Sequence, residues 1–233
     1  MRHRARFLLA AILGTAIVAS TAARQERHPV SGRVVAPTMS VQGAPWLDRP
    51  ERESEEQPTR AVDALRLKAG MVVADVGAGS GYYTVRLARA VGRAGQVYAT
   101  DLQPGMLELI RAKLTREKID NVTLVQGAAT DPRLPDARFD MVLMVDVYHE
   151  LSGPQAFIAR LKKALKPDGR LVLIEFRGED PNVPILPLHK MTVAQIRDEL
   201  AADGLVIERV IDVLPWQHIV ILKAAPQYSE NIR

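Results

Sequence analysis

Short apolar runs alternate with amphipathic segments of helical period along most of the chain. Runs rich in Val, Ile and Leu predict strands near residues 71–76, 96–101, 122–126, 139–145 and 170–176; the segments between them predict helices near 59–68, 81–91, 104–118, 153–164 and 191–202. This alternation is typical of βαβ units, in which helices join parallel strands. The pattern therefore predicts one α/β domain, which we place at residues 59–225.

Two further apolar runs close this domain, at residues 204–213 and 216–223. Only Leu214 and Pro215 separate them, which is too short for the crossover helix that parallel neighbours need. We therefore expect the last two strands to be antiparallel to each other. Residues 226–233 are expected to form a tail.

The first 23 residues have the three parts of an export signal. A basic stretch, Met1–Arg6, precedes an apolar run at residues 7–20, and small residues then offer cleavage after Ala22 or Ala23. This order predicts a signal peptide and an exported protein, periplasmic or secreted. The alternative is an uncleaved membrane anchor formed by residues 7–20, although this run is shorter than the ~20 residues that span a bilayer. Membrane contact would then involve this segment alone.

Residues 24–58 have little periodicity and several prolines and glycines. They predict an irregular arm, with a charged stretch at 51–56 that could be helical. Trp46, Arg49 and Arg52 in this arm could fold over a pocket of the α/β domain, which would make the arm a lid. A loosely packed arm is the alternative.

Composition narrows the class of protein. Of 233 residues, 47% are hydrophobic and 25% charged, as in an ordinary globular protein. The absence of cysteine excludes disulfides, thiolate metal sites and a cysteine nucleophile. Three of the 31 basic residues and none of the acids lie within residues 1–23, so the chain without that segment has 28 basic against 27 acidic residues. This balance predicts no nucleic-acid partner.

Candidate chemistry begins at a glycine-rich turn between the first strand and its helix. The sequence Asp75-Val-Gly77-Ala-Gly79-Ser-Gly81 differs in spacing from the Gly-x-Gly-x-x-Gly of dinucleotide sites. Asp75 would repel a pyrophosphate and attract an ammonium group. Asp101 closes the next strand, where an acid can accept both ribose hydroxyls of a nucleoside. Taken singly, the glycines could serve a tight turn and the acid another turn, but the combination favours a nucleoside ligand.

These residues resemble the cofactor-binding pattern of class I S-adenosylmethionine-dependent methyltransferases that act on small molecules. The segments Leu124–Gly127, Phe139–Val145 and Leu165–Ile174, the last with a Lys-Pro-Asp-Gly turn, also fit that family. The resemblance implies a Rossmann-like, seven-stranded, mostly parallel sheet with helices on both faces and an antiparallel last strand. It also implies S-adenosylmethionine as cofactor and a methyltransferase domain over residues 59–225.

The resemblance assigns roles to individual residues. Gly77, Gly79 and Gly81 would line the methionine and ribose portion of the cofactor, Asp75 its amino group, Asp101 its ribose hydroxyls and Leu102 its adenine. One departure concerns the third strand, which the family often follows with Gly-Asp. Here Gly127 is followed by two alanines, so the backbone at Ala128, or Asp131, would have to meet the adenine amine.

The fourth strand leads into the polar run Asp146-Val-Tyr148-His149-Glu150, at the edge of the sheet where ligands bind in open α/β folds. We expect His149 to act as a general base on the methyl acceptor, with Asp146 and Tyr148 as further catalytic candidates. The alternative is that His149 caps a helix or packs against the cofactor. Glu150 would orient His149 or face solvent.

Two more histidines, His189 and His218, follow in loops that we expect at the same edge, so we place both in the substrate pocket with Glu150 and Trp46. Each could instead make a structural hydrogen bond. Histidines and acids together can hold a metal ion, but no spacing matches a compact metal signature, so we predict no metal.

The sequence thus predicts an enzyme that transfers a methyl group from S-adenosylmethionine to a small-molecule acceptor of unknown identity. The alternative is an exported, non-catalytic binding protein that keeps the same fold. A nicotinamide-dependent oxidoreductase does not agree with the glycine spacing or with Asp75.

Overall fold

The computed structural model describes residues 25–226. The predicted signal peptide or anchor at residues 1–23, with the export it implies, and nearly all of the tail at 226–233 lie outside this range, so they stay predictions. Within it, no helix combines the length and the apolar character needed to cross a membrane.

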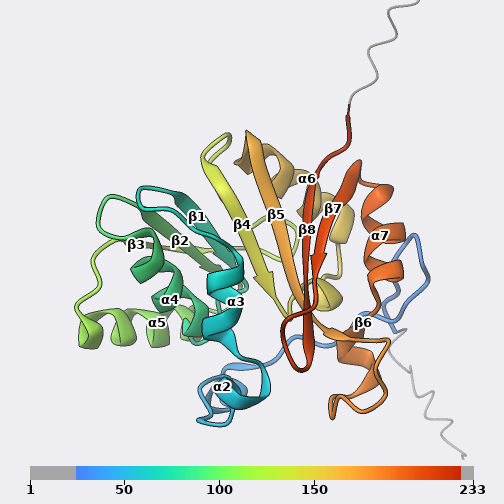
Figure 1. Cartoon of the computed structure of the whole chain (residues 1–233), viewed down its shortest axis with the longest axis horizontal. Coiled ribbons are helices and arrows are strands. Elements are labelled where there is room, and N and C mark those ends of the chain that lie inside the picture. Colours follow the sequence, from blue (N-terminus) through green and yellow to red (C-terminus); the bar gives the residue numbers. More distant parts are fainter. Residues whose placement is uncertain (1–24, 227–233) are drawn as a thin grey trace, which may run out of the picture.

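The described residues form an eight-stranded sheet in the order β3-β2-β1-β4-β5-β8-β7, with the short β6 paired to β5 (Figure 1). The strands are β1 Val72–Val76, β2 Gln96–Asp101, β3 Val122–Gln126, β4 Phe139–Val145, β5 Leu165–Arg177, β6 Lys190–Met191, β7 Leu205–Ile211 and β8 Gln217–Ala224. The neighbours along β3-β2-β1-β4-β5 are parallel, and so is the pair of β5 and β6. Strand β8 is antiparallel to both β5 and β7. The predicted Rossmann-like, mostly parallel sheet with an antiparallel last strand is confirmed, with eight strands rather than seven because β6 joins β5.

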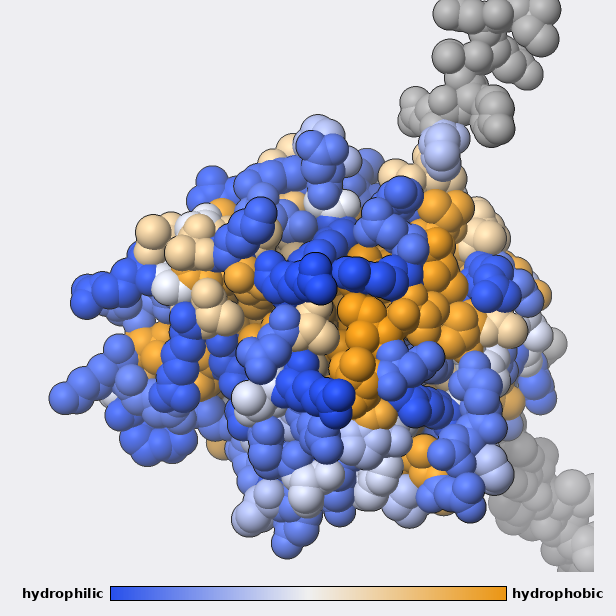
Figure 2. Space-filling view, in the orientation of Figure 1, coloured by the Kyte–Doolittle hydropathy of each residue, from blue (hydrophilic) through white to orange (hydrophobic). Residues whose placement is uncertain are grey.

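Helices cover both faces of the sheet. These helices are α3 Pro58–Ala64, α4 Tyr82–Val91, α5 Pro104–Glu117, α6 Pro154–Ala164 and α7 Val193–Ala201. Two short helices, α1 Ala44–Leu47 and α2 Arg52–Glu55, belong to the N-terminal arm. Successive residues of each strand face opposite layers, so Ala74 packs in the core beneath α6 and α7 while Val73 packs beneath α3 and α4. On the α3 side, Figure 2 shows an apolar surface over β7 and β8.

Three segments differ most from the sequence-based boundaries. The helix predicted at 59–68 ends at Ala64, and Arg66 beyond it has a positive φ of +51°. The fifth strand begins at Leu165 rather than 170, because Leu165 already pairs with Phe139 ahead of the Lys-Pro-Asp-Gly segment. The last helix begins at Val193 rather than 191, because Thr192 caps it through a reciprocal bond pair with Gln195. The residues just before this cap form β6, which the sequence pattern did not predict.

The N-terminal arm runs along the edge of the sheet where β4 and β5 end, and then reaches α2 (Figure 1). Ala36 donates its backbone N–H to the carbonyl of His149 at 3.1 Å, and the Arg33 guanidinium donates to the same carbonyl at 2.9 Å. Arg33 also pairs with the buried carboxylate of Glu199 at 3.0 Å. The arm therefore fixes the backbone that follows β4.

Candidate functional site

A cavity of about 650 Å³ opens at the carboxyl ends of β1, β2, β4 and β5. The strand order reverses between β1 and β4, and ligands of open α/β sheets bind at such a reversal. Its volume lies within the range of small-molecule sites. The predicted site residues that line it are Trp46, Gly77, Gly79, Asp101, Leu102, Ala128, Asp146, His149, Glu150 and His189.

The glycine loop leaves bare backbone at the cofactor end of this cavity. Gly77 has a φ of +68°, and a Cβ there would lie 2.5 Å from Cγ2 of Val147. Gly79 has a φ of +54°, and its Cβ would lie 2.8 Å from Leu47 in the arm. Because L-residues rarely adopt this conformation and neither position has room for a side chain, both positions require glycine.

Asp101 presents its carboxylate to the same end of the cavity. One oxygen accepts the N–H of Gly79 and the other the N–H of Gln103, each at 2.9 Å. Burial raises the pKa of Asp101, and the bonds from the two amides oppose that rise. Since each carboxylate oxygen can accept a second bond, the group can still hold two hydroxyls of a ligand.

Asp75 lies beneath the loop rather than in the cavity, and it accepts a hydrogen bond from the Thr84 hydroxyl at 2.6 Å. Burial, together with the negative charge of Asp101, raises the pKa of Asp75 to about 6. Gly81, the residue before α4, also lies outside the cavity. The predicted contacts of both residues with the cofactor stay predictions.

Replacing Asp75 with asparagine is expected to stabilise the cofactor-free protein above pH 6 but not below pH 4. The Asp75 carboxyl group keeps its proton to a higher pH in the folded chain than in the unfolded chain. The wild type therefore loses stability as the pH rises from about 4 to about 6. From the pKa difference, the loss is on the order of 3 kcal/mol. Urea unfolding of both proteins at pH 4 and pH 8 measures it. If the variant and the wild type differ in free energy of unfolding by the same amount at pH 4 and at pH 8, the raised pKa of Asp75 is contradicted.

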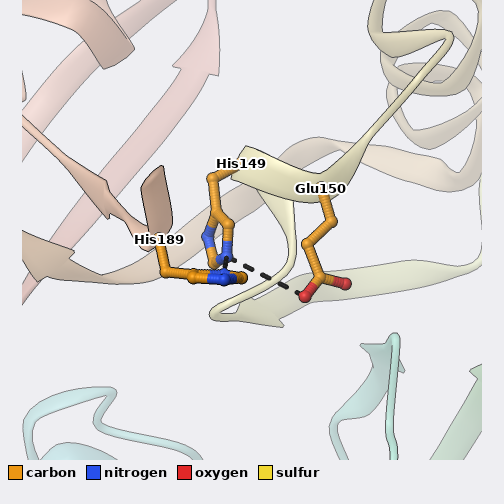
Figure 3. Close-up of side chains that lie close together, drawn as sticks. All are labelled: His149, Glu150 and His189. Atoms are coloured by element: carbon orange, nitrogen blue, oxygen red, sulfur yellow. Dashed lines mark hydrogen bonds and ion pairs between the residues drawn. The ribbon is translucent and has the colours of Figure 1, made fainter. Parts of the chain in front are cut away.

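The acceptor end of the cavity is built around His149, in the 3-10 turn Tyr148–Glu150 after β4. Its Nδ1 lies 2.6 Å from the carboxylate of Glu175, which is fully buried on β5. Its Nε2 lies 3.1 Å from Nδ1 of His189 and 3.9 Å from Oε1 of Glu150 (Figure 3). The structure thus brings together three predicted residues from two loops and adds Glu175.

The charges of His149, Glu150 and His189 depend on one another and on Glu175. Burial acts to lower the pKa of His149, but the Glu175 carboxylate outweighs it and the pKa is raised. Burial, and then the neighbouring His149, lower the pKa of His189. Burial raises the pKa of Glu150 to about 7. The pKa values of His149 and Glu150 are thus raised and that of His189 is lowered.

Asp146 also lines the cavity, at the end of β4 and with a positive φ of +54°. One of its oxygens accepts a bond from the Gln217 amide at 2.8 Å, and the other has no partner among residues 25–226. Burial and the nearby Glu56 and Glu175 raise its pKa well above the ordinary value. The buried Arg52 of the arm, which pairs with Glu56 at 2.7 Å, also lines the cavity.

Two predicted residues are placed elsewhere. The Tyr148 ring is buried away from the cavity, with its hydroxyl 3.2 Å from Nε2 of His28. His218 is buried at the start of β8, with Nδ1 3.9 Å from Glu179. Neither side chain lines the cavity, so the structure gives them no contact with a ligand bound there.

The cofactor end fits a nucleoside with a methionine tail. The backbone of Gly77 and Gly79, without side chains, and the carboxylate of Asp101, which can hold two hydroxyls, face the same cavity. Comparison with known proteins agrees. Residues 73–169 match the family described as "Methyltransferase domain". A solved structure, a SAM-dependent methyltransferase from Aquifex aeolicus, superposes with a TM-score of 0.75 at 29% identity, covering 79% of this chain and 98% of that one. In fold and sequence the chain is thus similar to class I S-adenosylmethionine-dependent methyltransferases, and its cavity fits S-adenosylmethionine.

Within that class, the chain resembles enzymes of quinone biosynthesis. It is 34% identical to the ubiquinone/menaquinone biosynthesis C-methyltransferase of Shewanella pealeana over 117 residues, and this alignment covers 49% of this chain and 46% of that protein. It is 35% identical to the demethylmenaquinone methyltransferase of Tropheryma whipplei over 144 residues, and this alignment covers 60% of this chain and 56% of that protein. The chain thus spans about half the length of these curated relatives.

Proposed function

We propose that this protein transfers the methyl group of S-adenosylmethionine to a ring carbon of a small hydroxylated aromatic molecule of the quinol type. The observation that carries the proposal is the division of the cavity. Gly79 and Asp101 line its β1–β2 end, whereas His149 and His189 line its β4–β5 end. The names of the relatives, a ubiquinone/menaquinone biosynthesis C-methyltransferase and a demethylmenaquinone methyltransferase, support the same acceptor class.

The walls between these two ends suit a flat apolar ring. Apolar side chains from several elements line the cavity there: Met39, Val147, Leu151, Phe157, Phe176, Ile185 and Leu186. Apolar walls bind an aromatic ring and leave its orientation to a few polar groups. A ring hydroxyl directed at His149 would place a neighbouring ring carbon toward the cofactor end.

When bound, S-adenosylmethionine supplies a methyl group on a positively charged sulfur. The chain has to align the acceptor with that group and exclude water. His149, oriented by Glu175, takes the proton of the ring hydroxyl, and the resulting oxygen anion makes the adjacent ring carbon nucleophilic. The new carbon–carbon bond forms as the methyl–sulfur bond breaks, the bonding pair stays on sulfur, and the ring carbon then loses its own proton to water.

A methyl-transfer assay with labelled S-adenosylmethionine tests this function. The full chain is incubated with reduced quinols and phenols lacking a ring methyl group, and with thiols and amines as the comparison set. We expect label in the quinols or phenols, on carbon, as located by NMR of the product. Label confined to thiols or amines would overturn the acceptor class.

Cofactor binding is measured alongside by thermal shift. S-adenosylmethionine and its demethylated product should raise the melting temperature by mass action, whereas NAD should not. Binding of both without transfer to any acceptor would favour the alternative of a non-catalytic binding protein.

A further inference from the structure

We propose that His149, Glu150 and His189 form a site for a divalent transition-metal ion, whose open side faces the cavity. Their ligand atoms, Nε2, a carboxylate oxygen and Nδ1, lie within 4.8 Å of one another (Figure 3). The site itself follows from the geometry of these residues. Its use in holding the acceptor's oxygen rests on the proposed function.

The separations suit one ion. Zinc binds imidazole nitrogen at about 2.0–2.1 Å and carboxylate oxygen at about 2.0–2.2 Å, so two of its ligands lie at most ~4.2 Å apart. The two imidazole nitrogens are 3.1 Å apart, and Nε2 of His149 is 3.9 Å from the Glu150 oxygen. A small rotation of the partly exposed Glu150 side chain closes the remaining distance to His189.

A second, independent observation is the carboxylate behind His149. Glu175 is fully buried, and Oε2 lies 2.6 Å from Nδ1 of His149 while Oε1 accepts the N–H of Tyr148 at 2.9 Å. When Nδ1 donates its proton to this carboxylate, the ring directs Nε2 toward His189, where its lone pair can bind a metal ion. A histidine that binds a metal almost always has such a carboxylate or carbonyl on its other nitrogen.

The ligand types select the class of ion. Two imidazoles and one carboxylate favour zinc, iron or a similar transition metal over magnesium or calcium, which prefer oxygen ligands. Three protein ligands leave a position open, as in catalytic zinc sites. All three residues line the cavity, so an acceptor oxygen could take that position.

With the ion bound, Nε2 of His149 would be a ligand and could not take the acceptor's hydroxyl proton, which would be released to water. The ion would then stabilise the acceptor's oxygen anion in place of the imidazole. A metal ion can do this as a Lewis acid, without accepting a proton. The oxygen anion would make the neighbouring ring carbon nucleophilic, as it does when His149 takes the hydroxyl proton.

Calorimetric titration of zinc into the chelator-treated full chain tests the site. We expect one zinc ion per chain, and loss of this binding in His189→Ala, whose side chain is partly exposed and leaves the core intact. Glu175→Gln should weaken zinc binding by about 10- to 100-fold, the usual effect of losing the group behind a ligand. The matched control is His28→Gln, a buried histidine outside the cavity, which should bind zinc as the wild type does.

Zinc binding that is absent, or equal in His189→Ala and the wild type, would overturn the site. Retained S-adenosylmethionine binding in each variant shows that it has folded. Methyl transfer that stops on chelation and returns with zinc supports the role of the ion, whereas full activity in the chelated protein overturns that role and leaves the proposed function intact. One zinc ion per chain in a protein that methylates nothing would support the site alone.

Discussion

Turnover of the His149→Gln variant is expected to fall by roughly 10²–10⁴-fold, the usual contribution of a positioned proton acceptor. The amide of glutamine cannot take the acceptor's proton at neutral pH. The affinity for S-adenosylmethionine should stay within a fewfold of the wild type, because Gly79 and Asp101 at the other end of the cavity are unchanged. Single-turnover rates at saturating cofactor, with the acceptor found in the labelled-methyl assay, measure the effect.

Folding and chemistry must be separated in this experiment, since His149 is buried. The His28→Gln variant removes another buried histidine without touching the cavity, so it reports the general cost of such a change. The expected pattern is a large loss of turnover in His149→Gln alone. Equal losses in both variants, or a loss of cofactor binding that parallels the loss of turnover, would show that His149 only supports the structure.

Asp101→Ala is expected to weaken S-adenosylmethionine binding by about 1.5–3 kcal/mol for each charge-assisted hydrogen bond to the ribose that is lost. Each such bond corresponds to a roughly 10- to 150-fold increase in Kd. Calorimetric titration of the cofactor into wild type and variant measures this. Asp120→Ala, which removes an exposed acid before β3, serves as the matched control and should bind the cofactor normally.

Asp101 also accepts N–H bonds from Gly79 and Gln103, so its loss could act through the loop. A cofactor analogue without ribose hydroxyls distinguishes the two explanations. If the contact is direct, this analogue should bind wild type and Asp101→Ala with similar affinity. An equal penalty for the analogue and for S-adenosylmethionine would place the effect in the loop and contradict the ribose contact.

Local patterns along the chain determined most of the fold. Apolar runs of strand length, separated by helical segments, are enough to predict a parallel sheet, and the two-residue link at Leu214 and Pro215 is enough to predict an antiparallel end. The boundaries that moved, at Leu165 and Val193, depend on a pairing across a turn and on a capping bond, which the apolar period does not encode.

The cofactor end of the site was also largely predictable. Gly77, Gly79 and Asp101 lie at the ends of two adjacent strands, and the topology of a parallel sheet brings strand ends to one edge. Backbone geometry alone thus places them together. Their conformations follow from the same local sequence, because glycine adopts positive φ more readily than other residues do.

The acceptor end was decided by tertiary packing. Tyr148 and His149 are neighbours in sequence, yet one side chain is buried against His28 and the other lines the cavity, because successive residues of a 3-10 turn point in different directions. Glu175 lies within an apolar strand, and its partner is 26 residues away. Which polar side chains meet at this edge depends on the packing of the arm, the loops and β5 against one another, and such long-range contacts leave no periodic signal in the sequence.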